Sequence, residues 1–203
     1  MRILILCAHT DDESGCAGTI ARLQPDHDIR YIAFSGIEVS LKNEGKDPGA
    51  ARKECKKSLD ILGISNYEIL KYPVRTFPSQ RQDILEFLVS ENKTFDPHII
   101  MTPATVDIHQ DHQVITQEAI RAFKYKTILG YEMPQNSVKF CSAVFFKLEQ
   151  KHIAKKLVSI SCYESQYNKP YFNPKFILNL ANLRGVQSGC EYAEAFEVIG
   201  AVI

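Results

Sequence analysis

No run of apolar residues in the sequence approaches the roughly 18 that a membrane-spanning helix requires. The first apolar run is short and reaches His9 and Asp11, whereas a signal peptide needs a longer apolar region and a small-residue cleavage site. We therefore expect neither a transmembrane segment nor a signal peptide, and we expect a cytoplasmic protein.

An excess of charge of either sign is also absent, because Lys and Arg number 24 and Asp and Glu number 24. This balance gives the chain no general attraction to nucleic acid or to an anionic membrane, so we expect no nucleic-acid partner. The six cysteines are scattered without a CxxC pair, and we expect them to be reduced packing residues. Cys16 lies near the first polar cluster described below, and we favour packing over metal ligation for it.

The 203 residues are instead typical of one globular domain, with 45% hydrophobic and 24% charged residues. Short apolar segments alternate with segments of helical periodicity along the whole chain, which we treat as a single domain, residues 1–203. The expected strands are 2–7, 28–34, 67–72, 99–101, 127–132, 142–148 and 195–202. The expected helices are 14–23, 51–62, one around 84–89, 114–123, 150–166 and 175–186.

This alternation predicts an α/β fold of the Rossmann-like, doubly wound type, with a mainly parallel sheet and helices on both faces. Residues 35–49 contain three glycines and mixed charge, and we expect them to form a long loop that covers a functional site. In such sheets, ligands bind at the carboxyl ends of the strands, near the point where the strand order reverses.

Two polar clusters follow strands at this edge of the expected sheet. His9, Asp11 and Asp12 come directly after the first strand, and His109-Gln110-Asp111-His112 follows the fourth. Each cluster alone has an ordinary interpretation, a solvated turn with a helix cap for the first and surface histidines for the second. Their coincidence at the same sheet edge favours a metal site, because imidazole and carboxylate ligands suit zinc.

Catalytic zinc takes about three protein ligands and keeps an open position for water. We expect His9, Asp12 and His112 to be the ligands, with Zn²⁺ as the metal and other divalent first-row ions as alternatives. Asp11 is then left beside the metal as a general base for the bound water.

Two residues of the second cluster remain for the substrate side. His109 is expected to face the substrate, where as a cation it would stabilise an oxyanion or protonate a leaving amine. Asp111 is expected to hold the His109 imidazole through its other nitrogen. Together the clusters describe hydrolysis of an amide or ester.

The motifs resemble those of the PIG-L/LmbE-like zinc-dependent de-N-acetylase family. Ala8-His9-Thr10-Asp11-Asp12-Glu13 is similar to its AHPDDE motif, and His109-Gln110-Asp111-His112 to its HPDH motif. Further similarities are Arg52, Glu54 and Leu62-Gly63, Ser165-Gln166, and Arg184-Gly185 followed by Tyr192-Ala193-Glu194-Ala195-Phe196. The resemblance implies zinc held by His9, Asp12 and His112, with Asp11 as base and His109 as electrophilic partner.

The sequence departs from the family pattern at three places. Thr10 and Gln110 replace prolines, and Arg75 lies where several family members carry an acidic residue that binds sugar hydroxyls. Arg75 and Arg81 either contact an anionic group of the substrate or are surface arginines. Arg52 likewise either contacts the substrate or forms a salt bridge on its helix.

The resemblance implies a hydrolase that removes an acetyl group from an N-acetylated amino sugar of the N-acetylglucosamine type. The alternatives are an amidase acting on a sugar–thiol conjugate or another amide, and a metal-binding partner protein without catalysis. A nucleotide-binding module is disfavoured, because no GxGxxG follows the first strand. The sequence gives no indication of the oligomeric state.

Overall fold

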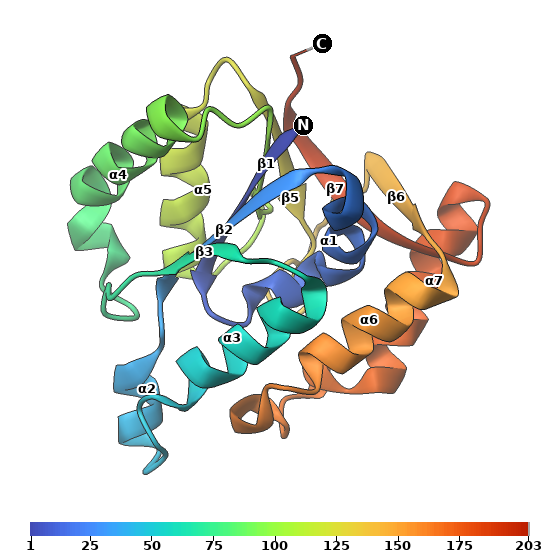
Figure 1. Cartoon of the computed structure of the whole chain (residues 1–203), viewed down its shortest axis with the longest axis horizontal. Coiled ribbons are helices and arrows are strands. Elements are labelled where there is room, and N and C mark those ends of the chain that lie inside the picture. Colours follow the sequence, from blue (N-terminus) through green and yellow to red (C-terminus); the bar gives the residue numbers. More distant parts are fainter. Residues whose placement is uncertain (203) are drawn as a thin grey trace.

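The computed structural model describes residues 1–202. Within this range, seven strands form one sheet in the order β3-β2-β1-β4-β5-β7-β6 (Figure 1). Strand β7 runs antiparallel to β5 and β6, and the other adjacent pairs are parallel. The bounds are β1 Arg2–His9, β2 Asp28–Ser35, β3 Asn66–Ile69, β4 Ile99–Pro103, β5 Thr127–Tyr131, β6 Val144–Leu148 and β7 Tyr192–Gly200.

Helices cover both faces of this sheet (Figure 1). Their bounds are α1 Ala17–Leu23, α2 Glu38–Asn43, α3 Ala50–Leu62, α4 Arg81–Thr94, α5 Gln110–Ala122, α6 Gln150–Ile160 and α7 Pro174–Ser188. Helices α4 and α5 enclose one core with Leu4 and Leu6, and α1, α3 and α6 enclose the other with Ile3 and Ile5. The expected fold class, a mainly parallel sheet with helices on both faces, is confirmed.

Strand β1 lies at the centre of the sheet between β2 and β4. Its residues Ile3 to Leu6 alternate between the two cores and are at most 1% exposed. A parallel strand covered on both faces must be apolar throughout, which explains the uninterrupted run of the sequence. The chain passes from β1 outward to β2 and β3 and then returns to β4 on the other side of β1. The strand order therefore reverses between β1 and β4, the strands that precede the two polar clusters.

The helix expected at 14–23 begins differently. A 3₁₀ turn, Asp12–Gly15, precedes α1, and Gly15 lies against the end of β5. A Cβ atom on Gly15 would lie 2.8 Å from Cδ2 of Tyr131 and 2.9 Å from the carbonyl oxygen of Glu132. This close approach requires glycine, because a Cβ atom would collide with the end of β5.

The prediction of a long loop over residues 35–49 is wrong in part, because the six-residue helix α2 forms within it. Ile37 precedes this helix in the left-handed region, at φ 51°, which is unusual for a β-branched residue. Glu38 of α2 is ion-paired with Arg52 of α3. A tertiary contact thus supports a six-residue helix whose own sequence buries only Leu41.

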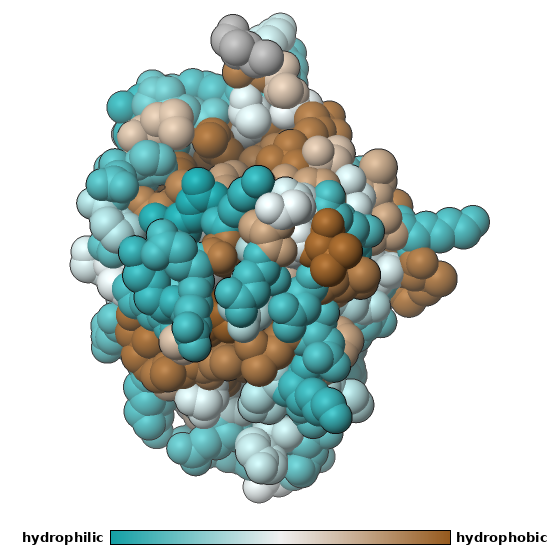
Figure 2. Space-filling view, turned by 90° about the vertical axis from the view of Figure 1, so that its right-hand side faces the viewer, coloured by the Kyte–Doolittle hydropathy of each residue, from teal (hydrophilic) through white to brown (hydrophobic). Residues whose placement is uncertain are grey.

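The other boundaries differ less. The third strand ends at Ile69, and the helix expected at 150–166 ends at Ile160, followed by a 3₁₀ turn at Glu164–Gln166. The closing strand begins at Tyr192. Within residues 1–202, no helix has both the length and the apolar character needed to cross a membrane. Figure 2 shows the side toward α6 and α7, where hydrophilic surface is interrupted by apolar patches.

Candidate active site

The first polar cluster lies at the carboxyl end of β1. His9 is the last residue of the strand, and its backbone N–H donates to Oδ2 of Asp12 at 2.8 Å. This hydrogen bond folds the Asp12 side chain back toward His9. Both side chains are largely withdrawn from solvent, at 7% exposure for His9 and 3% for Asp12.

The second cluster forms the start of α5. His109 is the N-cap residue of this helix, and its Nδ1 accepts a hydrogen bond from the backbone N–H of Asp111 at 3.2 Å. Asp111 and His112 follow in the first turn and are buried. Helix formation therefore points the second cluster at the end of β1.

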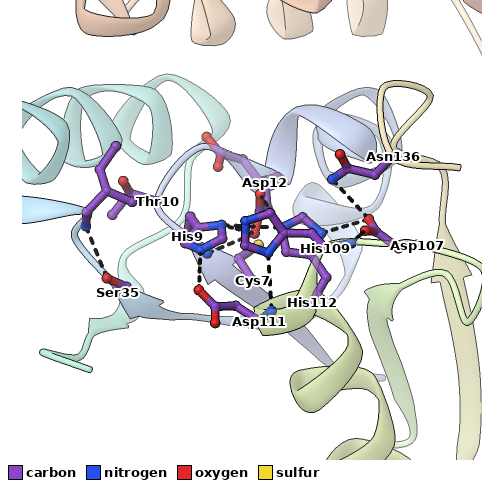
Figure 3. A network of polar contacts seen from close by, with 12 residues as sticks. Cys7, His9, Thr10, Asp12, Ser35, Asp107, His109, Asp111, His112 and Asn136 are labelled. Atoms are coloured by element: carbon purple, nitrogen blue, oxygen red, sulfur yellow. Dashed lines mark hydrogen bonds and ion pairs between the residues drawn. The ribbon is translucent and has the colours of Figure 1, made fainter. Parts of the chain in front are cut away.

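The two clusters meet around a single point (Figure 3). Nδ1 of His9 lies 3.2 Å from Nε2 of His112. The Asp12 carboxylate completes the group, with Oδ1 at 3.3 Å from His112 Nε2 and Oδ2 at 3.7 Å from His9 Nδ1. Zinc bonds of about 2.0–2.1 Å in tetrahedral geometry place neighbouring ligand atoms about 3.3 Å apart. The spacing therefore fits three ligands of one metal ion.

A second combination of donors exists at the same place. One nitrogen from each of His9, His109 and His112 can be chosen so that all three lie within 4.8 Å of one another. The contacts of Asp12 with the same two histidines are shorter, at 3.3 and 3.7 Å. The geometry therefore favours Asp12 as the third ligand and leaves His109 beside the group.

A carboxylate lies behind each of the two imidazoles that face one another. Oδ2 of Asp111 is 3.2 Å from His9 Nε2, and Oδ2 of Asp107 is 2.7 Å from His112 Nδ1. These contacts fix the ring orientations and leave His9 Nδ1 and His112 Nε2 for a metal. Such carboxylate–histidine pairs are the usual support of metal-binding imidazoles.

The expected partnership of Asp111 with His109 differs from the structure. The Asp111 carboxylate contacts His9 and accepts the backbone N–H of Arg75 at 2.6 Å. Only the backbone of Asp111 reaches His109. Residues two apart at a helix start point to different sides, so the Asp111 side chain is directed across the site to β1.

Asp107 is a residue of the site that the sequence interpretation missed. Besides contacting His112, it accepts the backbone N–H of His109 through Oδ1 at 2.8 Å. Asp107 thus organises the start of α5 as well as one imidazole. The only sequence signal is an acidic residue five positions before a candidate ligand, and this spacing does not fix the conformation of a loop.

In the cluster, the negative charges of buried carboxylates offset the positive charges of the protonated His9 and His112 imidazoles. Burial alone would lower the pKa of His9 and of His112, but Asp12 and the supporting carboxylates raise them to about 9 and about 10. For Asp12, burial opposes ionisation, yet His112 and His9 hold the pKa of the carboxyl well below its usual range. Positive charge at this point is therefore strongly favoured, and a divalent cation would supply it.

His109 behaves differently from the expected cation. Burial, followed by the charges of His9 and His112, lowers the pKa of His109 to about 4. Its imidazole is then neutral near pH 7. Because Nδ1 accepts from Asp111, the proton resides on Nε2, which is free to donate to a ligand.

Asp11 lies in the turn between the two ligand candidates of the first cluster and is half-buried. Within residues 1–202, its side chain forms no hydrogen bond with another side chain, unlike Asp12, Asp107 and Asp111. Burial, followed by the charge of Asp12, raises the pKa of Asp11 to about 6.

Beneath this turn, Glu13 is 1% exposed and accepts hydrogen bonds from Ser58, at 2.7 Å, and from Tyr163. The Tyr163 hydroxyl also contacts the carbonyl oxygen of Thr10. Helix α3 and the segment after α6 thereby brace the turn that carries Asp11 and Asp12.

A cavity of about 350 Å³ opens above these groups, with His9, Asp11, Asp12, His109 and His112 in its lining. Its walls come from α2, from the loop at 74–75, from residues 133–136 and from the segment 166–171. The site is therefore an open pocket of a size suited to a small molecule.

The three candidate arginines have different positions. Arg75 lines the cavity, with its backbone in the left-handed region at φ 69°. Arg81 is ion-paired with Glu118 of α5 at 2.5 Å and is not part of the cavity lining. Arg52, also outside the lining, pairs with Glu38 and donates to the carbonyl oxygens of Ile69 and Leu70. The sequence left substrate contact and a structural role open for Arg52 and Arg81, and the structure shows the second, because both form ion pairs outside the cavity lining.

The model of one protein family, described as GlcNAc-PI de-N-acetylase and named PIG-L, matches residues 4–123. This range includes both polar clusters and more than half of the chain. No curated protein matches the chain.

Solved structures with the same fold cover nearly the whole chain. The conserved protein TT1542 from Thermus thermophilus has a TM-score of 0.82 at 22% identity, covering 99% of this chain and 95% of that chain. The 4-carboxy-2-hydroxymuconate hydratase GalB from Pseudomonas putida has a TM-score of 0.81 at 18% identity, covering 100% and 97%. The N,N'-diacetylchitobiose deacetylase from Pyrococcus horikoshii has a TM-score of 0.78 at 19% identity, covering 98% and 83%.

Proposed function

This chain belongs to the PIG-L family, and we propose on that premise that it is a metal-dependent hydrolase acting on N-acetylated amino sugars. The reaction would release acetate from a conjugate of the N-acetylglucosamine type. The observation that carries the proposal is the convergence of His9, Asp12 and His112 atoms at 3.2–3.7 Å, at the bottom of an open cavity.

In this proposal, His9 Nδ1, His112 Nε2 and the Asp12 carboxylate hold one divalent metal, most suitably zinc. When bound, the metal would act as a Lewis acid that lowers the pKa of a coordinated water. Asp111 and Asp107 are positioning residues, because they contact the ligand imidazoles at 3.2 and 2.7 Å and orient them.

Asp11 is the proposed general base. It lines the cavity and, within the described residues, has no side-chain partner that would compete for its carboxylate. As the water oxygen bonds to the amide carbon, Asp11 accepts the proton of that water. The carbon–nitrogen bond then breaks, and the same proton passes to the departing amine, which yields acetate and the free amino sugar.

His109 is proposed to bind the carbonyl oxygen of the amide. Its Nε2–H is free to donate because Nδ1 is occupied by the backbone of Asp111. A donor fixed at a helix N-terminus stabilises the negative charge that develops on this oxygen. The role is that of a neutral hydrogen-bond donor rather than of a cation.

Arg75 is the one candidate arginine that remains in the substrate-binding proposal. Its backbone is held at the site from both sides, since its N–H donates to Asp111 and its carbonyl accepts from Gln110 at 2.7 Å. Lys169 lines the same cavity from the segment after α6. Both side chains suit the hydroxyl or anionic groups of a sugar conjugate.

The similarity to GalB defines the main competing activity, because one fold can support unrelated reactions. A hydratase would add water to a carbon–carbon double bond and would release no acetate. The absence of any acetate release, with one metal bound, would favour such a reaction, another amide, or a non-catalytic metal-binding protein.

The test is acetate release from free, glycosylated, nucleotide-linked and carboxylated N-acetylglucosamine, measured before chelation, after chelation and after zinc is restored. The proposal expects release that chelation abolishes and zinc restores. Release that persists in the thoroughly chelated protein would contradict the metal-dependent mechanism.

A further inference from the structure

A second depression adjoins the catalytic cavity on the side of the C-terminal segments. It has a volume of about 280 Å³ and is lined by Pro134, Gln135, Pro170, Tyr171 and Phe176. We call this depression the proline–aromatic groove. Its lining contains four apolar or aromatic residues and no charged side chain, in contrast to the catalytic cavity beside it.

The groove and the catalytic cavity share part of their walls. Gln135 and Tyr171 line both, so a ligand can extend from one space into the other. Burial raises the pKa of Tyr171 to about 12, with further contributions from the charges of Asp11 and Asp12. Tyr171 lines the same cavity as Asp11 and Asp12.

The groove presents apolar surface that is only partly covered by the rest of the protein. Phe176, in the first turn of α7, is 37% exposed. Pro134 and Pro170 border the same space, and their restricted backbones make its rim rigid. An exposed aromatic side chain on a rigid border loses little conformational freedom when a ligand covers it.

We propose that the proline–aromatic groove binds an apolar substituent carried on the sugar of the substrate, of the size of an aryl ring or a short alkyl chain. This inference rests on the proposed deacetylation, because it places the substituent on the sugar side of the amide bond that is cleaved.

The volume of the groove, about 280 Å³, fits an aryl ring or a short alkyl chain. A cavity of about 150 Å³ already accommodates benzene, so the groove is large enough for a ring. A stable protein partner needs about 800 Å² of surface on each side, from roughly 20–30 residues, whereas five residues line the groove. The acetyl group lies at the reacting centre and has only two carbons. A larger apolar group must therefore be attached to the sugar.

The experiment compares methyl and phenyl glycosides of N-acetylglucosamine, both anomers of each, as substrates of the zinc-loaded protein. Burying one face of a phenyl ring should lower KM about tenfold relative to the methyl glycoside. Equal KM values for the two glycosides would overturn the proposal while leaving deacetylation intact. A preference for a longer N-acyl chain with no preference for the phenyl group would overturn the assignment to the sugar side.

Two substitutions on α7 localise the effect. Phe176→Gln should bring the ratio of the methyl to the phenyl KM close to one. Leu183→Gln is the matched control, because Leu183 is 51% exposed on the same helix and lies outside the groove. A full phenyl preference in Phe176→Gln would contradict the proposal.

A binding measurement separates this inference from the activity. Saturation-transfer NMR with the phenyl glycoside should detect contact of its ring protons with the wild-type protein and a loss of this contact in Phe176→Gln. If no glycoside is hydrolysed, the proposed deacetylation of these sugars fails. The NMR contact of the phenyl ring then tests by itself whether the groove binds an apolar substituent. The absence of ring contact in the wild type would overturn the inference.

Discussion

The floor of the catalytic cavity and its rim are built differently. On the floor, His9 and His112 are buried, and each has a carboxylate on the nitrogen that faces away from the other. On the rim, Arg75 and Lys169 are exposed, and within the described residues neither side chain forms an ion pair. The floor is therefore fixed before any ligand arrives, whereas the rim is left free to adapt.

This difference separates chemistry from selectivity. A reacting centre requires groups held to within a fraction of an ångström, which buried and hydrogen-bonded side chains provide. Recognition of a particular sugar conjugate depends on side chains that can exchange water for ligand. Substitutions on the floor should therefore affect metal binding and turnover, and substitutions on the rim should affect KM and substrate preference.

The largest expected effect is that of His112→Ala on the floor. Removing one of the three proposed ligand atoms should abolish tight zinc binding and reduce acetate release to the uncatalysed background. Metal content after dialysis and acetate release would be measured together. His27→Ala serves as the control and should retain both. His27 directly precedes β2, at the amino ends of the strands, whereas the site lies at their carboxyl ends. Full zinc content in His112→Ala would exclude this residue as a ligand.

Asp11→Asn should separate turnover from metal binding. Because the proposed role of Asp11 is that of the base and not of a ligand, kcat should fall about 10²- to 10⁴-fold while one zinc per chain remains bound. Asp60→Asn makes the same chemical change at an exposed position of α3 and should be neutral. An Asp11→Asn protein with undiminished kcat would refute the assignment of the base.

Asp107→Asn should have an intermediate effect. The asparagine side chain has nearly the same shape but loses the charge that supports His112, so zinc affinity or activity should fall about 10- to 100-fold. Competition with a chelator of known affinity would measure the loss. Unchanged zinc affinity and activity would show that the 2.7 Å contact with His112 does not support the metal.

Arg75→Gln on the rim should have the smallest effect. An exposed ion pair contributes little, so KM for a carboxylated sugar should rise only about twofold to fivefold, with kcat unchanged. A neutral sugar should show no change. Lys56→Gln, an exposed cation on α3, is the control. A large fall in kcat would show that Arg75, through its backbone contact with Asp111, belongs to the floor.

The sequence was sufficient to predict where in the fold the candidate active site lies. The apolar run that ends at His9, together with the alternation of strands and helices, predicts a central parallel strand with polar residues at its carboxyl end. The reversal of strand order between β1 and β4 then follows from the rules of doubly wound sheets. The family prediction and the fold class are both confirmed.

The sequence was insufficient for contacts that depend on loop conformation and on long side chains. Asp107 acts through a loop whose path is set by the surrounding structure, and the direction of Asp111 depends on where α5 begins. Arg52 reaches back to α2, a helix too short to be recognised from its own residues. Local patterns cannot specify such contacts, because their partners come from other elements.

A crystal structure of the zinc-loaded protein, with the metal located by anomalous scattering, tests the central claim most directly. We predict one zinc ion about 2.0–2.2 Å from His9 Nδ1, His112 Nε2 and an oxygen of Asp12, with Asp11 unligated. Zinc bound by His109 in place of Asp12, or zinc bound away from the end of β1, would contradict the account.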